Sequence, residues 1–156
     1  MNSLAGCASK KTAHITVDTQ WLDSVRSKAD TVYSKKYRNN EFVTAEYLVN
    51  KKDSFVCQVM KDSSGMIRQI IQAKNNVRIY TSSFYSNGQL MAKLLTDSFG
   101  KFNGPAVYYF ENGNVKEEGV YLHGFYSGSW KNYDDKNNLL YTSEYNANGE
   151  LINATK

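Results

Sequence analysis

The sequence predicts a mainly β protein: a twisted antiparallel β-meander of hairpin repeats, with one N-terminal helix packed on it. Two recurring phrases and a β-rich composition support this prediction. The first phrase occurs three times, at residues 85–90, 110–115 and 135–140, and its turn residues Gly88, Gly113 and Asn138 are spaced 25 residues apart. The second occurs at residues 102–109 and returns 24 residues later. Repetition at such a period indicates stacked supersecondary units.

The composition is typical of strands and tight turns. The chain holds 12 Tyr and 7 Phe but one Pro, and nine of its ten glycines lie at or after Gly65. Its 19 basic and 15 acidic residues are interspersed, so the net charge of +4 forms no basic stripe. We therefore expect no binding to nucleic acid.

The sequence offers no pattern for catalysis, a cofactor or a metal. Two cysteines, Cys7 and Cys57, are too few for a disulfide framework, and His14 and His123 are too far apart in sequence to complete a zinc site. A nucleophile elbow, a phosphate loop, a zinc-binding helix and a calcium loop are all missing. We predict a protein that is not an enzyme and that holds neither metal nor cofactor.

Residues 1–11 form the first predicted division, a lipobox with a tether. The tetrapeptide that ends at Cys7 resembles the lipobox of bacterial lipoproteins, in which the cysteine carries the lipid, and a short polar tract follows it. A signal peptide needs basic and apolar regions before that site, and here only three residues precede the box. Either the sequence begins inside a longer precursor or the match is a coincidence.

We favour a longer precursor, which predicts lipidation of Cys7. Because no Asp follows Cys7, the resemblance implies a periplasmic protein anchored to the outer membrane. If Met1 is the true start, the protein is instead cytoplasmic.

Residues 12–61 form a lead segment of one helix and one hairpin. Apolar residues recur at helical spacing between Thr19 and about Arg38, and Asp18 or Thr19 is available as the N-cap. The competing interpretation is a pair of short strands, because residues 31–33 favour β-structure. Period-two alternation in residues 42–49 and 55–60 then predicts a hairpin, in which Cys57 is a small buried hydrophobe.

Residues 62–156 form the repeat sheet. Each repeat places Asn-Gly or a close relative between two β-prone runs, which predicts two-residue hairpins whose central residues both take positive φ. Alternation puts Phe102, Gly104, Ala106 and Tyr108 on one face, where large rings beside glycines suit a ring that covers a neighbouring strand. Pro105 indicates an edge or a bulge.

The repeats resemble the bacterial variant of the MORN repeat found in YwqK-like antitoxins. The phrases that carry the resemblance are residues 109–121, 123–133 and 145–151. The fit extends over residues 80–152 and fades before Asp62, and Asn138 replaces the turn glycine in the third copy. The resemblance implies a twisted antiparallel sheet, no intrinsic catalysis, and a role as the immunity or antitoxin partner of a secreted bacterial toxin.

Seven aromatic residues are the candidate partner-binding site: Tyr108, Tyr109, Tyr121, Phe125, Tyr126, Trp130 and Tyr133. One interpretation is that they cover a thin sheet that has no second layer. The other is that part of this surface stays exposed, since Tyr and Trp are enriched at binding hot spots. We predict an immunity protein that neutralises a cognate toxin by occlusion; the alternative is a structural outer-membrane lipoprotein that serves as a protein- or lipid-binding scaffold.

Overall fold

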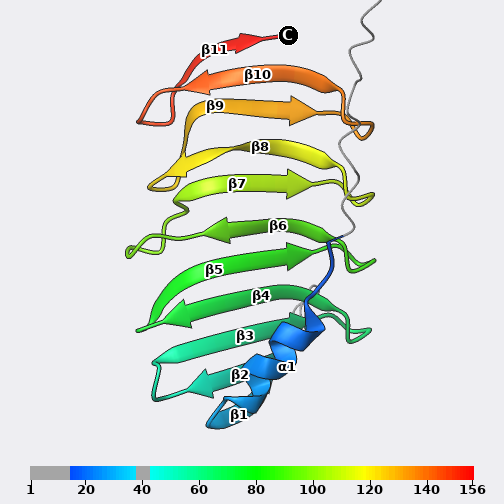
Figure 1. The fold of residues 1–156 in the computed structure, drawn as a ribbon, viewed down its shortest axis with the longest axis vertical. Coiled ribbons are helices and arrows are strands. Elements are labelled where there is room, and N and C mark those ends of the chain that lie inside the picture. Colours follow the sequence, from blue (N-terminus) through cyan, green and yellow to red (C-terminus); the bar gives the residue numbers. More distant parts are fainter. Residues whose placement is uncertain (1–14, 38–42) are drawn as a thin grey trace, which may run out of the picture.

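The computed structural model describes residues 15–37 and 43–156, so the predicted lipidation site Cys7 lies outside the described residues. The described chain forms one antiparallel sheet whose eleven strands follow each other in sequence order (Figure 1). The predicted β-meander with an N-terminal helix is therefore confirmed. The elements are α1 (Thr19–Ser27), β1 (Thr31–Lys36), β2 (Thr44–Asn50), β3 (Phe55–Lys61), β4 (Ile67–Lys74), β5 (Val77–Phe84), β6 (Leu90–Leu95), β7 (Gly104–Tyr109), β8 (Val115–Leu122), β9 (Phe125–Tyr133), β10 (Leu139–Tyr145) and β11 (Leu151–Thr155).

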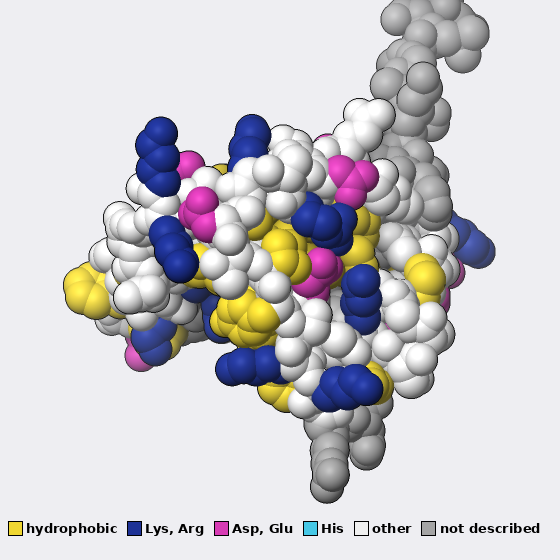
Figure 2. Space-filling view, turned by 90° about the horizontal axis from the view of Figure 1, so that it is seen from below, with side chains coloured by type: hydrophobic (Ala, Val, Ile, Leu, Met, Phe, Trp, Pro, Cys, Tyr) yellow, Lys and Arg dark blue, Asp and Glu magenta, His cyan; other side chains and the backbone are white. Residues whose placement is uncertain are grey.

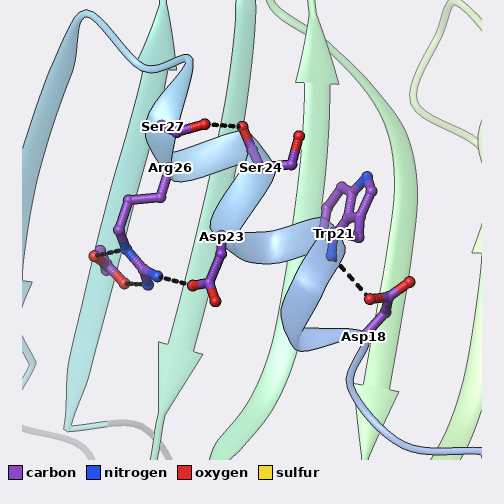
Figure 3. A network of polar contacts seen from close by, with 7 residues as sticks. Asp18, Trp21, Asp23, Ser24, Arg26 and Ser27 are labelled. Atoms are coloured by element: carbon purple, nitrogen blue, oxygen red, sulfur yellow. Dashed lines mark hydrogen bonds and ion pairs between the residues drawn. The ribbon is translucent and has the colours of Figure 1, made fainter.

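The helix α1 crosses the N-terminal strands on one face of the sheet (Figure 1). Its N-cap is Asp18, whose carboxylate accepts a hydrogen bond of 2.8 Å from the backbone N–H of Trp21 (Figure 3). Leu22 is buried against the sheet. The Arg26 guanidinium donates to both carboxylate oxygens of Glu46 on β2, at 3.2 and 3.0 Å, and so ties the helix to the strand beneath it.

The predicted extension of the helix to Arg38 is wrong, because α1 ends at Ser27 and Thr31–Lys36 is the strand β1. The competing interpretation, a pair of short strands, is right for residues 31–33 and wrong for residues 19–27, which form α1. Asp30 starts the strand: its backbone N–H donates to the Val49 carbonyl, and its carboxylate accepts from the N–H of Lys51. Pairing with β2 thus outweighs the helical spacing of the apolar residues.

The predicted hairpin of the lead segment is confirmed as β2 and β3. Leu48 pairs with Cys57 in the middle of this ladder, and both side chains are buried, as predicted for Cys57. Since β3 also pairs with β4, the sheet continues without a break past residue 61. The division of the chain into a lead segment and a repeat unit stays a prediction.

The Asn-Gly turns differ from the predicted two-residue hairpins. At the β5–β6 turn, the N–H of Gly88 donates to the Tyr85 carbonyl and the N–H of Tyr85 donates to the Gln89 carbonyl. This pattern is a type I turn followed by a bulge, in which Gly88 alone takes positive φ, 83°. The bulged form wins because Asn87 folds its side chain back to accept from the N–H of Gln89.

The prediction that Asn138 takes the place of the turn glycine in the third copy is wrong. Asn137, with φ of 67°, takes the left-handed conformation there, and Asn138 does not. The carboxylate of Asp134 accepts from the backbone N–H groups of Lys136 and Asn138 and fixes this register. Two-residue turns with positive φ at both positions occur elsewhere, at residues 75–76 and 123–124.

Asparagine side chains connect successive turns on the side of the sheet where β5, β7 and β9 end. Asn87 in the β5–β6 turn donates to the carbonyl of Glu111 in the β7–β8 turn, at 3.0 Å. Asn112 in that second turn donates to the carbonyl of Asp135 in the β9–β10 turn, at 2.9 Å. The β5–β6, β7–β8 and β9–β10 turns are therefore bonded one to the next.

Two hydrophobic clusters lie on opposite faces of the sheet. The helix-side cluster comprises Leu22, Leu48, Cys57, Val59, Ile70, Phe84 and Leu90, and the second comprises Ala92, Leu94, Ala106, Tyr121 and Trp130. Phe84 faces the helix, so its neighbour Ser83 faces away, and Ala92 pairs with Ser83. The core thus changes faces at β6.

The ladder between β6 and β7 is short. Within the named strands it has a single pair, Ala92 with Tyr108, and the bridge between Thr96 and Phe102 supplements it. Pro105, which predicted an edge or a bulge, lies in the interior strand β7, and its pairing partner is Val120 on β8. Pro105 lies in the part of β7 between the Ala92–Tyr108 pair and the Thr96–Phe102 bridge, where no ladder pair joins β7 to β6.

Candidate interaction surface

Trp130 is the centre of the second hydrophobic cluster. Its side chain is completely buried and lies on the backbone of Gly119, where an added Cβ would be 2.3 Å from the indole. The indole N–H donates to the carbonyl of Val120 at 3.0 Å. The prediction that a ring covers a glycine of the neighbouring strand is confirmed here, and Gly119 is the residue that allows it.

Tyrosines surround this indole. The Tyr126 ring stacks on Trp130 with 3.9 Å between ring centroids, and Tyr121 meets Trp130 edge-on at 5.1 Å. Tyr145 packs edge-on against Tyr126, and the hydroxyls of Tyr108 and Tyr121 are 3.0 Å apart. These five aromatic residues form the apolar layer of a half-sheet that no described helix covers.

Burial controls ionisation within this aromatic cluster. It is the main cause that raises the pKa of Tyr108, Tyr121 and Tyr126. Burial also raises the pKa of the nearby Glu117 carboxyl, against the opposing effects of Lys116 and a hydrogen bond with Tyr126. The phenols keep their protons at neutral pH and act as hydrogen-bonding groups.

The structure separates the seven aromatic residues that the sequence predicted as one binding site. Trp130 and Tyr121 are buried, which corrects the expectation that they could serve as surface anchors, and Tyr108 and Tyr126 are half-buried beside them. Tyr109 packs against the helix-side cluster. The two that remain, Phe125 and Tyr133, are on the helix-side face, and Phe125 is 56% exposed.

The part of the helix-side face that α1 leaves uncovered carries exposed apolar side chains. We define this open helix-side face by six residues: Val107, Glu118, Val120, Leu122, Phe125 and Lys131. Leu122 pairs directly with Phe125 across the β8–β9 hairpin, and Val120 is two residues from Leu122 on the same side of β8. Val120 is 44% exposed and Leu122 is 37% exposed.

A shallow depression of about 340 Å³ lies on this face, and charged residues border it. Glu118 is paired with Val107 on one side and with Lys131 on the other. The Tyr133 hydroxyl donates to Glu118 at 2.6 Å, and burial together with this hydrogen bond raises the pKa of Tyr133 to about 12. The open face therefore combines apolar side chains with opposite charges held in register.

Val120 and Leu122 were not predicted as surface residues, because the site predicted from the sequence contained only aromatic residues. Both lie on the other side of the strand that carries Tyr121. The signal was present in the alternation. Once Gly119 is assigned to the aromatic side, its neighbours Glu118 and Val120 must face the other way.

Among the described residues, no group of three or more His, Cys, Asp or Glu side chains is placed to hold a metal ion. No helix in residues 15–37 or 43–156 is long and apolar enough to cross a membrane.

Comparison with known proteins gives one family match. No curated protein is significantly similar to the chain. The crystal structure of TarM aligns with 69% of this chain and 23% of the TarM chain, at 9% sequence identity and a TM-score of 0.38. The chain thus spans under a quarter of TarM, and a likeness this weak does not establish a common fold. Residues 102–123, which span β7 and β8, match the family model described as a MORN repeat variant, so this part of the sheet is a MORN repeat variant.

Proposed function

We propose that this protein is a non-catalytic immunity protein that binds a cognate bacterial toxin through the open helix-side face and neutralises it by occlusion. The observation that carries the proposal is the continuous exposure of Val120, Leu122 and Phe125 on one side of the β8–β9 hairpin. Contiguous exposed apolar residues with a polar rim are typical of protein-binding sites. A MORN repeat is consistent with a binding or scaffold role.

The choice of a toxin as the partner comes from the resemblance of residues 80–152 to YwqK-like antitoxins. Occlusion needs no reacting group on this protein, only a rigid surface that covers the site of the toxin. The hairpin supplies rigidity because Trp130 fixes β9 against β8 from the opposite face. Little conformational entropy would then be lost when a partner binds.

The proposal includes an outer-membrane anchor at Cys7, which would hold the protein in the periplasm where an incoming toxin arrives. Expression from the chromosomal locus, followed by mass spectrometry of the N-terminal peptide, tests the anchor. We expect Cys7 to be the lipid-bearing first residue and Cys7→Ser to leave the protein unlipidated. A mature protein that retains Met1 contradicts the anchor and favours the cytoplasm.

The binding experiment uses the product of the adjacent gene as the candidate toxin. We expect co-expression to relieve toxicity and calorimetry to detect a complex. The double substitution Val120→Ser with Phe125→Ser should weaken binding by at least tenfold, because it removes two exposed apolar contacts. Phe99→Ser is the matched control, since Phe99 is 83% exposed on the loop between β6 and β7.

Two outcomes decide between the proposals. If Val120→Ser with Phe125→Ser binds as tightly as the unmodified protein, the open helix-side face is not the binding site. If the adjacent product is not toxic and forms no complex, the immunity role fails, and the structural lipoprotein scaffold becomes the better proposal.

A further inference from the structure

Within the part of the chain that the structure describes, β11 is an edge strand that pairs only with β10. All five of its residues are exposed, with Leu151 at 58% and Ile152 at 67%. The neighbouring β10 adds the exposed side chains of Leu139, Leu140 and Tyr141. An edge strand with free backbone groups and no charge is a template on which another strand can pair.

The opposite edge of the sheet is built differently. Strand β1 carries Lys35 and Lys36 near its end, and Figure 2 shows Lys and Arg side chains spread over this end of the molecule. Lysines on an edge strand discourage pairing, because a partner strand would have to bury their charges. In contrast, Leu151–Thr155 contains no lysine and no other charged residue.

The sequence around β11 is complementary to itself when it is read in the antiparallel direction. Asn153 is the midpoint of the strand, and two of the three pairs of residues at equal distances from it are complementary. Bulky Ile152 would face small Ala154 of a second copy. Glu150 and Lys156 are each three residues from Asn153, so each would face its opposite charge in the other copy. Opposite charges and large–small pairs directly across two strands stabilise a ladder.

We propose that two copies of this chain pair through β11, antiparallel and with a two-fold axis at Asn153, and form one continuous sheet. Glu150 is already held at the start of the strand, because its carboxylate accepts a hydrogen bond of 2.7 Å from Asn146. The axis closes the contact after two copies, since the same strand is used on both sides. A contact between β11 and β1 would instead leave two edges free and continue into a filament.

The dimer leaves the open helix-side face accessible. Ala154 pairs with Ser143, and Ser143 pairs with Trp130, so Ala154 lies on the aromatic side of the sheet. Leu151 pairs with Tyr145 on that same side, and Ile152 lies at the register shift between Leu151 and Asn153. Because β10 separates β11 from the β8–β9 hairpin, the dimer contact does not cover Val120 and Phe125, and the dimer would present the open helix-side face twice.

Sedimentation equilibrium over a range of protein concentrations tests the proposal with charge exchange. We expect the unmodified chain to dimerise. Glu150→Lys alone and Lys156→Glu alone should each raise the dimer dissociation constant about tenfold, because each places like charges opposite one another at two symmetric positions. The double variant Glu150→Lys with Lys156→Glu restores opposite charges and should return the constant to within about threefold of the original. Glu111→Lys, the same change on an exposed turn away from β11, is the matched control.

Each remaining outcome overturns the proposal. A chain that stays monomeric at every concentration has no such interface. A dimer whose dissociation constant ignores both single exchanges, or is not restored by the double variant, pairs elsewhere or in another register. Growth beyond two copies indicates a contact between unlike edges.

Discussion

Trp130 lies so close to the backbone of Gly119 that a Cβ at that position would be 2.3 Å from its ring. We predict that Gly119→Ala lowers the free energy of unfolding by about 3 kcal/mol, because the indole must leave its position and the surrounding tyrosines must repack. Urea denaturation followed by circular dichroism measures this loss.

Gly128→Ala is the control for that substitution. Gly128 has φ of 64° and no atom near the position of an added Cβ, so alanine there meets backbone strain without a clash. We expect a cost of about 1 kcal/mol. Equal losses in the two variants would show that the indole can move away from Gly119 freely.

Cys57 predicts how stability depends on alkaline pH. Burial raises the pKa of its thiol from 9.0 to about 12. Below pH 9 the thiol is neutral in the folded and the unfolded chain, whereas above it the unfolded thiol ionises first, so unfolding releases a proton and stability falls as pH rises toward 12. At about pH 10.5 we expect a loss of about 2 kcal/mol from this group.

The measurement compares urea denaturation at pH 8 and at about pH 10.5 in the unmodified protein and in Cys57→Ala. The variant is less stable at both values because it leaves a cavity, but its stability should fall less between them. Tyr47 and Tyr133, whose pKa values are also raised to about 12, act in the same direction in both proteins. Identical slopes would rule out the buried thiol as a contributor.

Among the elements, α1 is joined to β2 by an ion pair between Arg26 and Glu46, in addition to its apolar packing on the sheet. The Arg26 side chain is 39% exposed and that of Glu46 17% exposed, so solvent screens this pair only in part. The hydrogen bond with Glu46 is the main cause that raises the pKa of Arg26. We predict that Glu46→Gln lowers the free energy of unfolding by about 1.5 kcal/mol, as measured by urea denaturation.

Asp23→Asn supplies the contrast, because Asp23 bonds the same guanidinium at 2.8 Å while 73% exposed. Its replacement should cost less than about 0.5 kcal/mol. If both variants lose the same free energy of unfolding, the pair between Arg26 and Glu46 stabilises the protein no more than the exposed pair between Arg26 and Asp23.

The strands and turns show where sequence reasoning succeeds and where it fails. Alternation located β2 and β3, and the Asn-Gly signals predicted a run of hairpins through residues 62–156, because each hairpin is specified by residues close together in the chain. The end of α1 was not predictable in this way, since Val32 and Tyr33 suit either a helix face or a strand. Pairing between Asp30 and Val49 decides the outcome, and that contact is distant in sequence.

The candidate site was harder to predict for a related reason. Composition identified aromatic residues but could not say which side of the sheet lacked a helix. Trp130 was expected at the surface, yet it fills space that Gly119 leaves in the adjacent strand. Which residues are core and which are surface depends on this pairing, so Val120 and Phe125 became visible as a surface only in three dimensions.

For the whole molecule, the two hydrophobic clusters meet at β6, beside the short β6–β7 ladder, and we expect the two parts of the sheet to open separately. We predict that amide hydrogen exchange in the loop at residues 97–101 is at least tenfold faster than in the β8–β9 ladder, because the hydrogen bonds of this loop close a local turn on an exposed part of the surface. Hydrogen-exchange mass spectrometry with peptide resolution measures both regions in one experiment. Uniform protection from β3 to β10 would mean that the sheet opens as a single unit.

The asparagine contacts between turns make the repeats modular. Asn87 and Asn112 each donate to the equivalent turn of the next repeat, so these two contacts join neighbouring repeats. A duplicated unit of about 24 residues would present the same asparagine and the same carbonyl at both of its junctions. The length of this sheet is thus free to change by whole units during evolution or by design.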